Sequence, residues 1–317
     1  MKRKKSKLKI QSKGKAYCLT DSPLYNLSTK KRLSKILNQS TLELTALCCD
    51  VGNYSEFEDV GKNGKPRKIQ KPLVKLDVIH TRIASLLSRI KLPDYLHSGK
   101  KKHSNVTNAR AHTGTSKVLA TDIKSFFPST TKKMVFSFFY SVMKCSPDVA
   151  NILANLCTYH SHVPTGSRIS MPLAFWANIR MFNELENLSI KHDVTMTVYV
   201  DDLTFSGDNT NKLFRSCVNR IISKHGHTMH PTKTKLYKAE QPKLITGVVV
   251  KGNELKVRNE QHYLLSSEMD LWKAIKNEAN ASQTPLMSKL VGRLYSMGVI
   301  DERFKAKAIS VKSSTCA

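Results

Sequence analysis

Asp201 and Asp202, two adjacent carboxylates between two apolar runs, constrain the fold more than any other feature of the sequence. Residues 194–198 are rich in β-favouring side chains and residues 203–205 form a second apolar run, which together predict a hairpin with both aspartates at its turn. Neighbouring carboxylates at the end of a hydrophobic strand repel each other and lose solvation, so a fold that keeps them usually binds cations there. The pair therefore predicts metal chemistry.

The charge balance predicts a nucleic-acid partner. The 317 residues carry 52 Lys plus Arg against 24 Asp plus Glu, a formal net charge of +28, and basic residues run from Lys2 to Lys312. This spread fits a long polyanion that lies across the body of the protein better than it fits a single basic tail. The length allows two or three packed units.

The rest of the composition predicts a cytoplasmic protein with no membrane partner. No uncharged run is long enough to cross a bilayer, and the basic start of the chain is not followed by the apolar segment of a secretory signal. Seven cysteines without paired or regular spacing favour reduced thiols over a disulfide frame or a zinc site.

The N-terminal third predicts a basic arm followed by helices and a hairpin. Residues 1–22 are rich in Lys and Ser and poor in large apolar groups, which predicts a flexible arm. Ser40 and Glu43 predict a capping box at a helix start. The expected elements are helices at 28–38 and 40–51, strands at 57–60 and 67–70 around an Asn-Gly turn, a helix from Leu76 to about residue 90, and a loop at 91–116.

The middle of the chain predicts the order strand, helix, helix, hairpin, helix, strand, which is that of a split βαβ unit. A short strand at 118–120 leads to Asp122, so this topology brings a third carboxylate beside the turn of Asp201 and Asp202. The other expected elements are a helix capped by Ser129 or Thr130 that runs to about residue 143, helices after Ser146-Pro147, after Gly166 up to about residue 190 and at 211–224, strands at 244–250 and 254–257, and helices from there to about Lys312.

Three converging carboxylates suit a site for two magnesium ions. Mg²⁺ prefers oxygen ligands in near-octahedral geometry, and one or two carboxylates per ion, completed by water and substrate phosphates, meet that need. Asp122 and Asp201 are the expected shared ligands, and Asp202 joins or tunes the cluster. The alternative is that the Asp-Asp pair belongs to an ordinary surface turn or helix cap.

These residues resemble those of reverse transcriptases. Residues 121–129 are similar to motif A of that family, and Tyr199 to Asp202 are similar to its Tyr-x-Asp-Asp motif C. Residues 67–72 are similar to the fingers motif and residues 163–166 to the motif B loop, so the resemblance covers most of residues 55–260. It implies an α+β right-hand polymerase with fingers, a ferredoxin-like split βαβ palm and a small helical thumb.

Two further stretches resemble bacterial retron reverse transcriptases in particular. Residues 108–112 are similar to their Asn-Ala-x-x-His element, and residues 245–247 to their Val-Thr-Gly element. The chain departs from the family pattern at Thr165, where Gln is usual, at Met171, where Pro is usual, and at Val200, where Ala is usual. The resemblance therefore leaves the nucleotide-facing contacts of the motif B loop undefined.

The resemblance also implies roles for single residues. The metal ligands would be Asp122, Ile123, Asp201 and Asp202. The nucleotide contacts would be Arg67 on the triphosphate, Phe127 against the sugar, Gly166 at the motif B loop, and Lys233 as a proton donor to the leaving pyrophosphate. Asn108, His112, Thr246 and Gly247 would bind RNA or serve as family motifs. The alternatives are a core aromatic for Phe127, a solvated charge for Arg67 and a bystander for Lys233.

The function implied by this resemblance is RNA-directed DNA synthesis from dNTPs with two Mg²⁺ ions. The template would be a cognate structured non-coding RNA, partly copied into a branched, RNA-linked DNA (msDNA), and an effector protein in anti-phage defence would be a further partner. The corresponding segments are a basic arm at 1–22, fingers and N-terminal helices at 23–116, the palm at 117–240, and the palm edge with an RNA-binding thumb at 241–317. Two alternatives remain, a group II intron or diversity-generating reverse transcriptase, and a non-catalytic RNA-binding scaffold.

Overall fold

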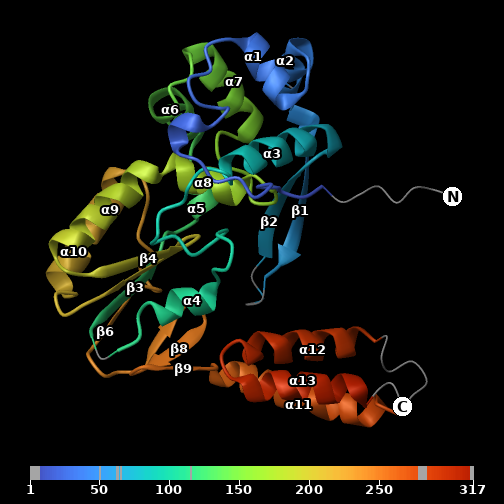
Figure 1. Cartoon of the computed structure of the whole chain (residues 1–317), viewed down its shortest axis with the longest axis vertical. Helices are drawn as coiled ribbons and strands as arrows, with labels where there is room; N and C mark the ends of the chain where they lie inside the picture. Colours follow the sequence, from blue (N-terminus) through green and yellow to red (C-terminus); the bar gives the residue numbers. More distant parts are fainter. Residues whose placement is uncertain are drawn as a thin grey trace. The chain divides into compact units, whose positions relative to one another are not determined.

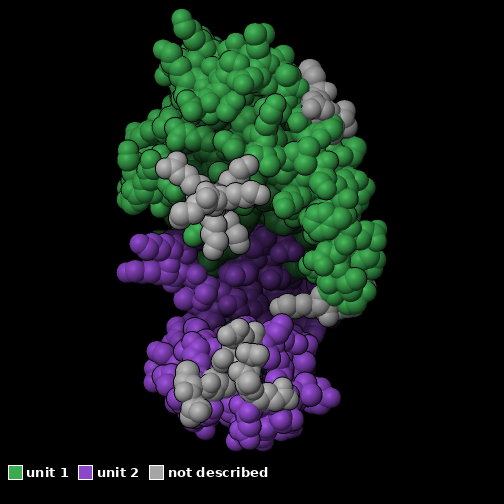
Figure 2. Space-filling model, turned by 90° about the vertical axis from the view of Figure 1, so that its right-hand side faces the viewer, with its two compact units in different colours: residues 1–99, 122–188, 216–232 green, residues 100–121, 189–215, 233–317 purple. Residues whose placement is uncertain are grey.

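The computed structural model describes residues 8–49, 51–61, 64, 66–114, 116–277 and 284–314. These residues form a mixed helical and sheet structure, as the predicted α+β class requires. The chain divides into two compact units, each built from separated segments (Figure 2). Unit 1 comprises residues 1–99, 122–188 and 216–232, and unit 2 comprises residues 100–121, 189–215 and 233–317.

Unit 1 begins with three helices, α1 (Lys30–Leu37), α2 (Thr41–Cys49) and α3 (Val74–Leu87), after a short 3₁₀ turn η1 (Leu19–Asp21). The predicted capping box is confirmed, since the Ser40 N–H donates to Glu43 Oε2 at 2.9 Å and the Glu43 N–H donates to Ser40 Oγ at 3.1 Å. The described part of the predicted flexible arm is attached to α3, where the Gln11 N–H donates to Ser85 Oγ at 3.0 Å.

The predicted N-terminal hairpin is confirmed. Strands β1 (Tyr54–Val60) and β2 (Pro66–Pro72) follow a 3₁₀ turn η2 (Val51–Asn53) and pair antiparallel, with Phe57 opposite Ile69. Part of the predicted Asn-Gly turn, residues 62 and 63, lies outside the described residues. Most side chains of this ribbon are exposed, so it is held by its strand pairing more than by a core.

The other helices of unit 1 correct two predictions. They are α5 (Phe126–Ser129), α6 (Lys132–Ser137), the π-helical turn η3 (Phe138–Val142), α7 (Pro147–Cys157) and α8 (Ser170–Ala177), while α9 (Ile179–Lys191) and α10 (Lys212–Lys224) contribute residues to both units. The cap of α6 is Thr131 and not Ser129 or Thr130, because those two residues end the separate helix α5. The single helix predicted after Gly166 is broken at Asn178, whose amide donates to Thr130 Oγ1 at 3.0 Å.

A four-stranded sheet of order β4-β5-β3-β6 carries the predicted hairpin (Figure 1). Its strands are β3 (Val118–Asp122), β4 (Thr195–Tyr199), β5 (Asp202–Ser206) and β6 (Lys235–Tyr237). β4 and β5 pair antiparallel with Tyr199 opposite Asp202, and β3 pairs antiparallel with β6. The strand ending at Asp122 and the hairpin are confirmed, whereas β6 was not predicted.

A second, three-stranded sheet of unit 2 corrects the prediction of one strand at 244–250. That segment is a hairpin of β7 (Lys243–Ile245) and β8 (Val248–Lys251), closed by Thr246 and Gly247, which both have positive φ; β9 (Glu254–Lys256) pairs with β8. The predicted loop at 91–116 contains the helix α4 (Asn105–Arg110). Val106 and Ala109 of α4 are buried in one cluster with residues of β7 and β8, and Figure 1 shows α4 beside β8.

The C-terminal segment is helical, as predicted. Helices α11 (Asn259–Ile275), α12 (Pro285–Gly298) and α13 (Glu302–Ser313) lie side by side around a small core that includes Trp272, Leu290 and Leu294 (Figure 1). A partly buried ion pair joins α11 and α12, with Arg293 Nε 2.7 Å from Glu268 Oε2. None of the helices in the described part of the chain is long and apolar enough to cross a membrane.

Candidate active site

The β4–β5 hairpin has one apolar face and one hydroxyl face. Met196, Val198, Leu203 and Phe205 are buried on one side, where Phe205 meets the ring of Phe214 on α10 at 5.5 Å. The alternate positions, which point to the opposite side of a strand, are residues 195, 197, 204 and 206, all Thr or Ser. The apolar face anchors the hairpin in the core and leaves the hydroxyl face for polar contacts.

The turn of this hairpin carries the aspartates on a strained backbone. Only Val200 and Asp201 lie between the paired residues Tyr199 and Asp202. Val200 has a φ of 61°, a left-handed conformation that costs a residue with a Cβ about 1–2 kcal/mol. Such strain persists where the surroundings hold the backbone, and it often marks functional turns.

Asp122 lies at the end of β3, and the strand order makes β3 the neighbour of β5, which begins with Asp202. Asp122 is buried, and its backbone carbonyl accepts a hydrogen bond from the His230 N–H at 2.8 Å. The next residue, Ile123, is also buried and offers only its backbone carbonyl as a metal ligand. Among the described residues, no three His, Cys, Asp or Glu side chains form a ready-made metal cluster.

Gly166 is required by the close approach of the motif B loop to β2. Its N–H donates to the Gln70 carbonyl at 3.2 Å, and a Cβ at this position would lie 2.8 Å from that same oxygen. Thr165, which departs from the family pattern, uses its hydroxyl to donate to the Lys68 carbonyl at 2.7 Å. The sequence predicted the glycine but not these contacts to the hairpin ribbon.

His80 supports the same loop from inside unit 1. Its Nδ1 lies 2.6 Å from Ser167 Oγ and its Nε2 lies 2.7 Å from the Leu156 carbonyl. Since a carbonyl only accepts, Nε2 carries the proton and Nδ1 accepts from the serine hydroxyl. Burial lowers the pKa of His80 to about 4, so the ring is neutral at pH 7. His80 was not predicted as a site residue.

The two phenylalanines after Asp122 differ in exposure. Phe126 is buried against the rings of Phe182 and His227, at 6.3 and 5.8 Å. Phe127 is partly exposed, and its ring centroid lies 5.8 Å from that of Phe126. The alternative in which both rings belong to the core therefore fits Phe126 but not Phe127.

Arg67 and Lys233, the two predicted cationic contacts, are both exposed. The Arg67 side chain passes over Gly61 across the β1–β2 ribbon, and it forms no ion pair with an acidic residue in the described part of the chain. Lys233 precedes Thr234, whose hydroxyl lies 2.7 Å from that of Thr121 on β3.

The four predicted family-motif residues, Asn108, His112, Thr246 and Gly247, all lie in unit 2. Thr246 Oγ1 donates to the Asn105 carbonyl at 2.9 Å, and Asn108 Nδ2 lies 3.5 Å from the same hydroxyl. His112 contacts the hydroxyl face of the β4–β5 hairpin. Asn108 and His112 are 0% and 2% exposed, so their side chains are committed to internal contacts. The sequence indicated these motifs but not that they meet, nor the contribution of Asn105.

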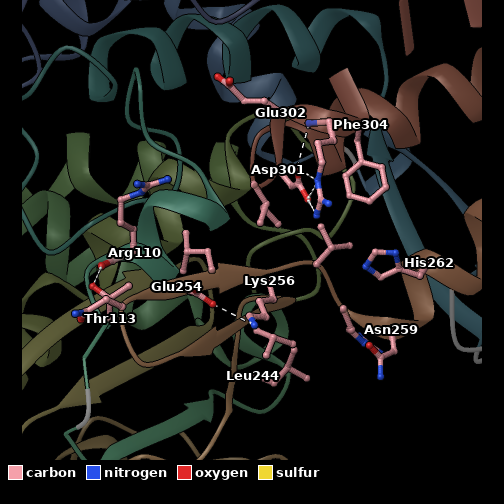
Figure 3. Close-up of a pocket in the computed structure, with 17 residues that line it drawn as sticks. Arg110, Thr113, Leu244, Glu254, Lys256, Asn259, His262, Asp301, Glu302 and Phe304 are labelled. Atoms are coloured by element: carbon pink, nitrogen blue, oxygen red, sulfur yellow. Dashed lines mark hydrogen bonds and ion pairs between the residues drawn. The ribbon is translucent and has the colours of Figure 1, made fainter. Parts of the chain in front are cut away.

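A pocket of about 1140 Å³ lies within unit 2, lined by α4, the β7-β8-β9 sheet and the C-terminal helices (Figure 3). Lys256 and Arg303 in its wall pair with Glu254 and Asp301 at 3.1 and 2.7 Å. Arg110 is exposed and has no ion pair with a described residue. Figure 3 shows Arg110 on the opposite side of the pocket from the rings of Phe304 and His262, which lie 5.5 Å apart.

Comparison with known proteins relates the chain to one group of enzymes, although no family model matches it. It is 30% identical over 223 residues to the retron Se72 reverse transcriptase of Salmonella heidelberg (strain 579083-10), a match that covers 66% of this chain and 58% of that protein. The retron Mx65 reverse transcriptase of Myxococcus xanthus is 29% identical over 221 residues, which cover 63% of this chain and 52% of that protein.

A third relative, the retron Ec86 reverse transcriptase of Escherichia coli, is 24% identical over 244 residues, which cover 75% of this chain and 74% of that protein. The chain matches little more than half the length of the first two relatives. These matches agree with the sequence resemblance to retron reverse transcriptases. The chain is therefore similar in sequence to bacterial retron reverse transcriptases.

Proposed function

We propose that this chain is an RNA-directed DNA polymerase of the retron type, which copies part of a cognate structured RNA into a branched, RNA-linked DNA. The observation that carries the proposal is the Tyr199 to Asp202 turn on the β4–β5 hairpin, in a sheet where the next strand, β3, ends at Asp122. The homology to retron reverse transcriptases supports the same activity. In this proposal unit 1 contributes fingers and part of the palm, and α11 to α13 are the thumb.

Asp122, Asp201 and Asp202 are the proposed ligands of two Mg²⁺ ions, with the Ile123 carbonyl as a further oxygen donor. The fit rests on the donor set, because carboxylate and carbonyl oxygens at the ends of neighbouring strands are what Mg²⁺ prefers. When bound, the two ions would activate the attacking hydroxyl and stabilise the leaving pyrophosphate. The buried Asp122 and the strained turn at Val200 would keep the carboxylates from relaxing away from each other.

The proposed contacts of the incoming dNTP follow from the sequence motifs. Arg67, exposed and without a described acidic partner, would bind the triphosphate bidentately. Phe127, the partly exposed ring of its pair, would exclude a ribose 2′-hydroxyl by steric contact. Gly166, which lies against β2, would give the backbone close access to the nucleotide, and Lys233 would protonate the leaving pyrophosphate.

The RNA would lie across the basic surface, and the pocket of unit 2 is the proposed site for its specific stem-loop. Arg110 would pair with a backbone phosphate, while an unpaired base would stack on the exposed side of Phe304. A retron effector protein in anti-phage defence and a cytoplasmic location follow from the same proposal.

The proposal is tested by primer extension on an RNA template with Mg²⁺ and dNTPs, comparing the wild type with Asp201→Asn. We expect extension by the wild type and none above background by the variant, which keeps the size of the side chain but loses its charge. Equal extension by both proteins would overturn the assignment of the aspartates. Tight RNA binding without extension by the wild type would instead identify a non-catalytic scaffold.

A further inference from the structure

His112 joins the two strands that carry the aspartate turn. Its Nε2 lies 2.6 Å from Thr197 Oγ1 on β4, and its Nδ1 lies 2.7 Å from Ser206 Oγ on β5. Both contacts are to the hydroxyl face of the hairpin, and all three residues lie in unit 2. One buried ring thus links the two strands, at Thr197, two residues before Tyr199, and at Ser206, four residues after Asp202.

Asp202 belongs to the same face as these hydroxyls. It is paired with Tyr199, and two steps along each strand the pairing is Thr197 with Thr204. Since residues two apart on a strand point to the same side, Asp202, Thr204 and Ser206 share one side of β5. His112 therefore supports the hairpin on the side from which the Asp202 side chain projects.

The segment that carries His112 is itself anchored at its other end. Ser104 and Thr107 form a capping box at the start of helix α4. Asn105, the first residue of the helix, donates from Nδ2 to the Thr246 carbonyl at 3.1 Å. Thr246 returns a hydrogen bond from Oγ1 to the Asn105 carbonyl at 2.9 Å. Residues 104–112 thus connect the β7–β8 turn to the β4–β5 hairpin, and we call this segment the brace.

The backbone of Thr246 indicates that its side chain, rather than the turn, accounts for this residue. Thr246 has a φ of 43° in a two-residue turn, where Asn or Gly is the favoured residue and a β-branched side chain is strained. The turn alone does not require threonine. The hydroxyl that threonine supplies is bonded to Asn105 and lies near Asn108, so the contact to the brace explains the residue better than the turn does.

Direct RNA contact is a poor account of His112 and Asn108. Side chains that are 2% and 0% exposed present no surface on which a base or phosphate could bind. Arg110 of the same segment is exposed and lines the pocket, so the brace has an internal role at two positions and a surface role at a third.

We propose that His112 is a positioning residue that fixes the β4–β5 hairpin through Thr197 and Ser206, and so sets the position of Asp201 and Asp202 for nucleotide transfer. This inference rests on the polymerase function proposed above. It makes the Asn-Ala-x-x-His segment part of the catalytic support rather than an RNA contact, with Thr246 as the anchor of its far end.

The test uses substitutions that remove one hydroxyl at constant shape, measured in the full chain at saturating RNA and dNTP. Thr197→Val should lower the maximal extension rate about tenfold, the equivalent of ~1.4 kcal/mol in the barrier. Thr204→Val is the matched control, because Thr204 is directly opposite Thr197 on the same buried face, whereas the His112 ring nitrogens lie at Thr197 and Ser206. Its rate should stay within about twofold of the wild type.

Three further readouts separate positioning from other roles. RNA affinity should be unchanged in Thr197→Val. The double variant His112→Leu/Thr197→Val should be no slower than His112→Leu alone, because His112→Leu already removes the contact to Thr197. Amide hydrogen exchange of residues 195–206, which needs no activity, should be faster in both single variants than in Thr204→Val. Weaker RNA binding at an unchanged maximal rate, or equal exchange in all variants, would overturn the proposal.

The two proposals fail in different ways. If the wild type does not extend a primer, the polymerase function fails, while hydrogen exchange still decides whether His112 fixes the hairpin. If the wild type extends and Thr197→Val extends equally well with unchanged exchange, the polymerase function stands and the positioning role is refuted.

Discussion

The β4–β5 and β7–β8 hairpins of unit 2 both close with two residues, and both place a β-branched residue at positive φ in the first position of the turn. They differ in what that turn does. The Val200 turn presents Asp201 and Asp202, and its support comes from the strands, through His112. The Thr246 turn has no acidic residue, and its own hydroxyl is the support. Strain accompanies a candidate catalytic turn in one hairpin and a structural anchor in the other, so a strained turn alone does not identify an active site.

The largest expected contrast between the hairpins concerns the polymerase activity of variants at their turns. Asp201→Asn removes a proposed metal ligand and should lower the extension rate at least about a thousandfold, because metal-stabilised charge contributes several kcal/mol to the barrier. Thr246→Ala removes only an anchor and should lower it about tenfold or less. The comparison is made by single-turnover extension on RNA, and similar losses in both variants would remove the distinction between the turns.

Lowering the pH should destabilise unit 1 through His80 but should leave the contacts of the Thr246 turn unaffected. Burial lowers the pKa of His80 to about 4, below its ordinary value of 6.5. The neutral ring therefore stabilises the fold fully above pH 6.5, and this contribution, up to about 3 kcal/mol, is lost as the pH falls to about 4. The contacts of Thr246 involve only amide, hydroxyl and carbonyl groups and have no such dependence.

This pH dependence is measured by denaturant unfolding between pH 7 and pH 4. In His80→Gln, which keeps a polar side chain without a titrating ring, the stability loss over that range should be smaller than in the wild type. The control variant Thr246→Ala should retain the wild-type dependence, because it removes no titrating group. An identical slope for His80→Gln and the wild type would contradict the buried neutral state of His80.

Glycine at the first position of each turn should have opposite effects on stability. Val200→Gly relieves left-handed strain of about 1 kcal/mol and should leave the free energy of unfolding unchanged or slightly higher. Thr246→Gly relieves similar strain but loses the hydroxyl contacts to Asn105 and Asn108, so it should lower that free energy by about 1 kcal/mol. Equal shifts, measured by urea unfolding at pH 7, would show that the hydroxyl of Thr246 contributes no anchor.

The smallest expected effect is on RNA affinity, and it should differ between two residues of the brace. Arg110→Ala should weaken RNA binding a few-fold and reduce the slope of log affinity against log salt by about 1, as expected for one lost phosphate contact. His112→Leu should leave both quantities unchanged. Lys251, an exposed cation of β8 that is not part of the pocket wall, is the matched control as Lys251→Ala. Unchanged salt dependence in Arg110→Ala would remove the pocket from the proposed RNA site.

The sequence was most informative where short β-favouring or apolar runs flank acidic residues. The runs at 194–198 and 203–205, on either side of Asp201 and Asp202, predicted the β4–β5 hairpin, and the short apolar run at 118–120 predicted the strand before Asp122. The hairpin of β7 and β8 was missed because residues 244–250 form a nearly continuous apolar run, and Thr246 gives none of the usual Asn-Gly signal. β6 has only three residues and depends on its pairing with β3.

The brace could not be predicted because its stability comes from distant contacts. Residues 104–113 contain few apolar side chains beyond Val106 and Ala109, and three lysines at 100–102 precede them, so local propensity favoured a loop. α4 forms because Ser104 and Thr107 cap it and because Val106 and Ala109 pack on the second sheet. His112 reaches partners 85 and 94 residues away, a distance at which a single sequence carries no pairing signal.

The most direct test of the central claim, that this chain makes RNA-linked DNA, is digestion of the nucleic acid that co-purifies with it from cells expressing its native operon. The account predicts DNA that runs faster on a denaturing gel after RNase treatment, because a branched RNA is removed, and that is absent from preparations of Asp201→Asn. Co-purifying RNA without DNA, or DNA whose mobility RNase does not change, would contradict the claim.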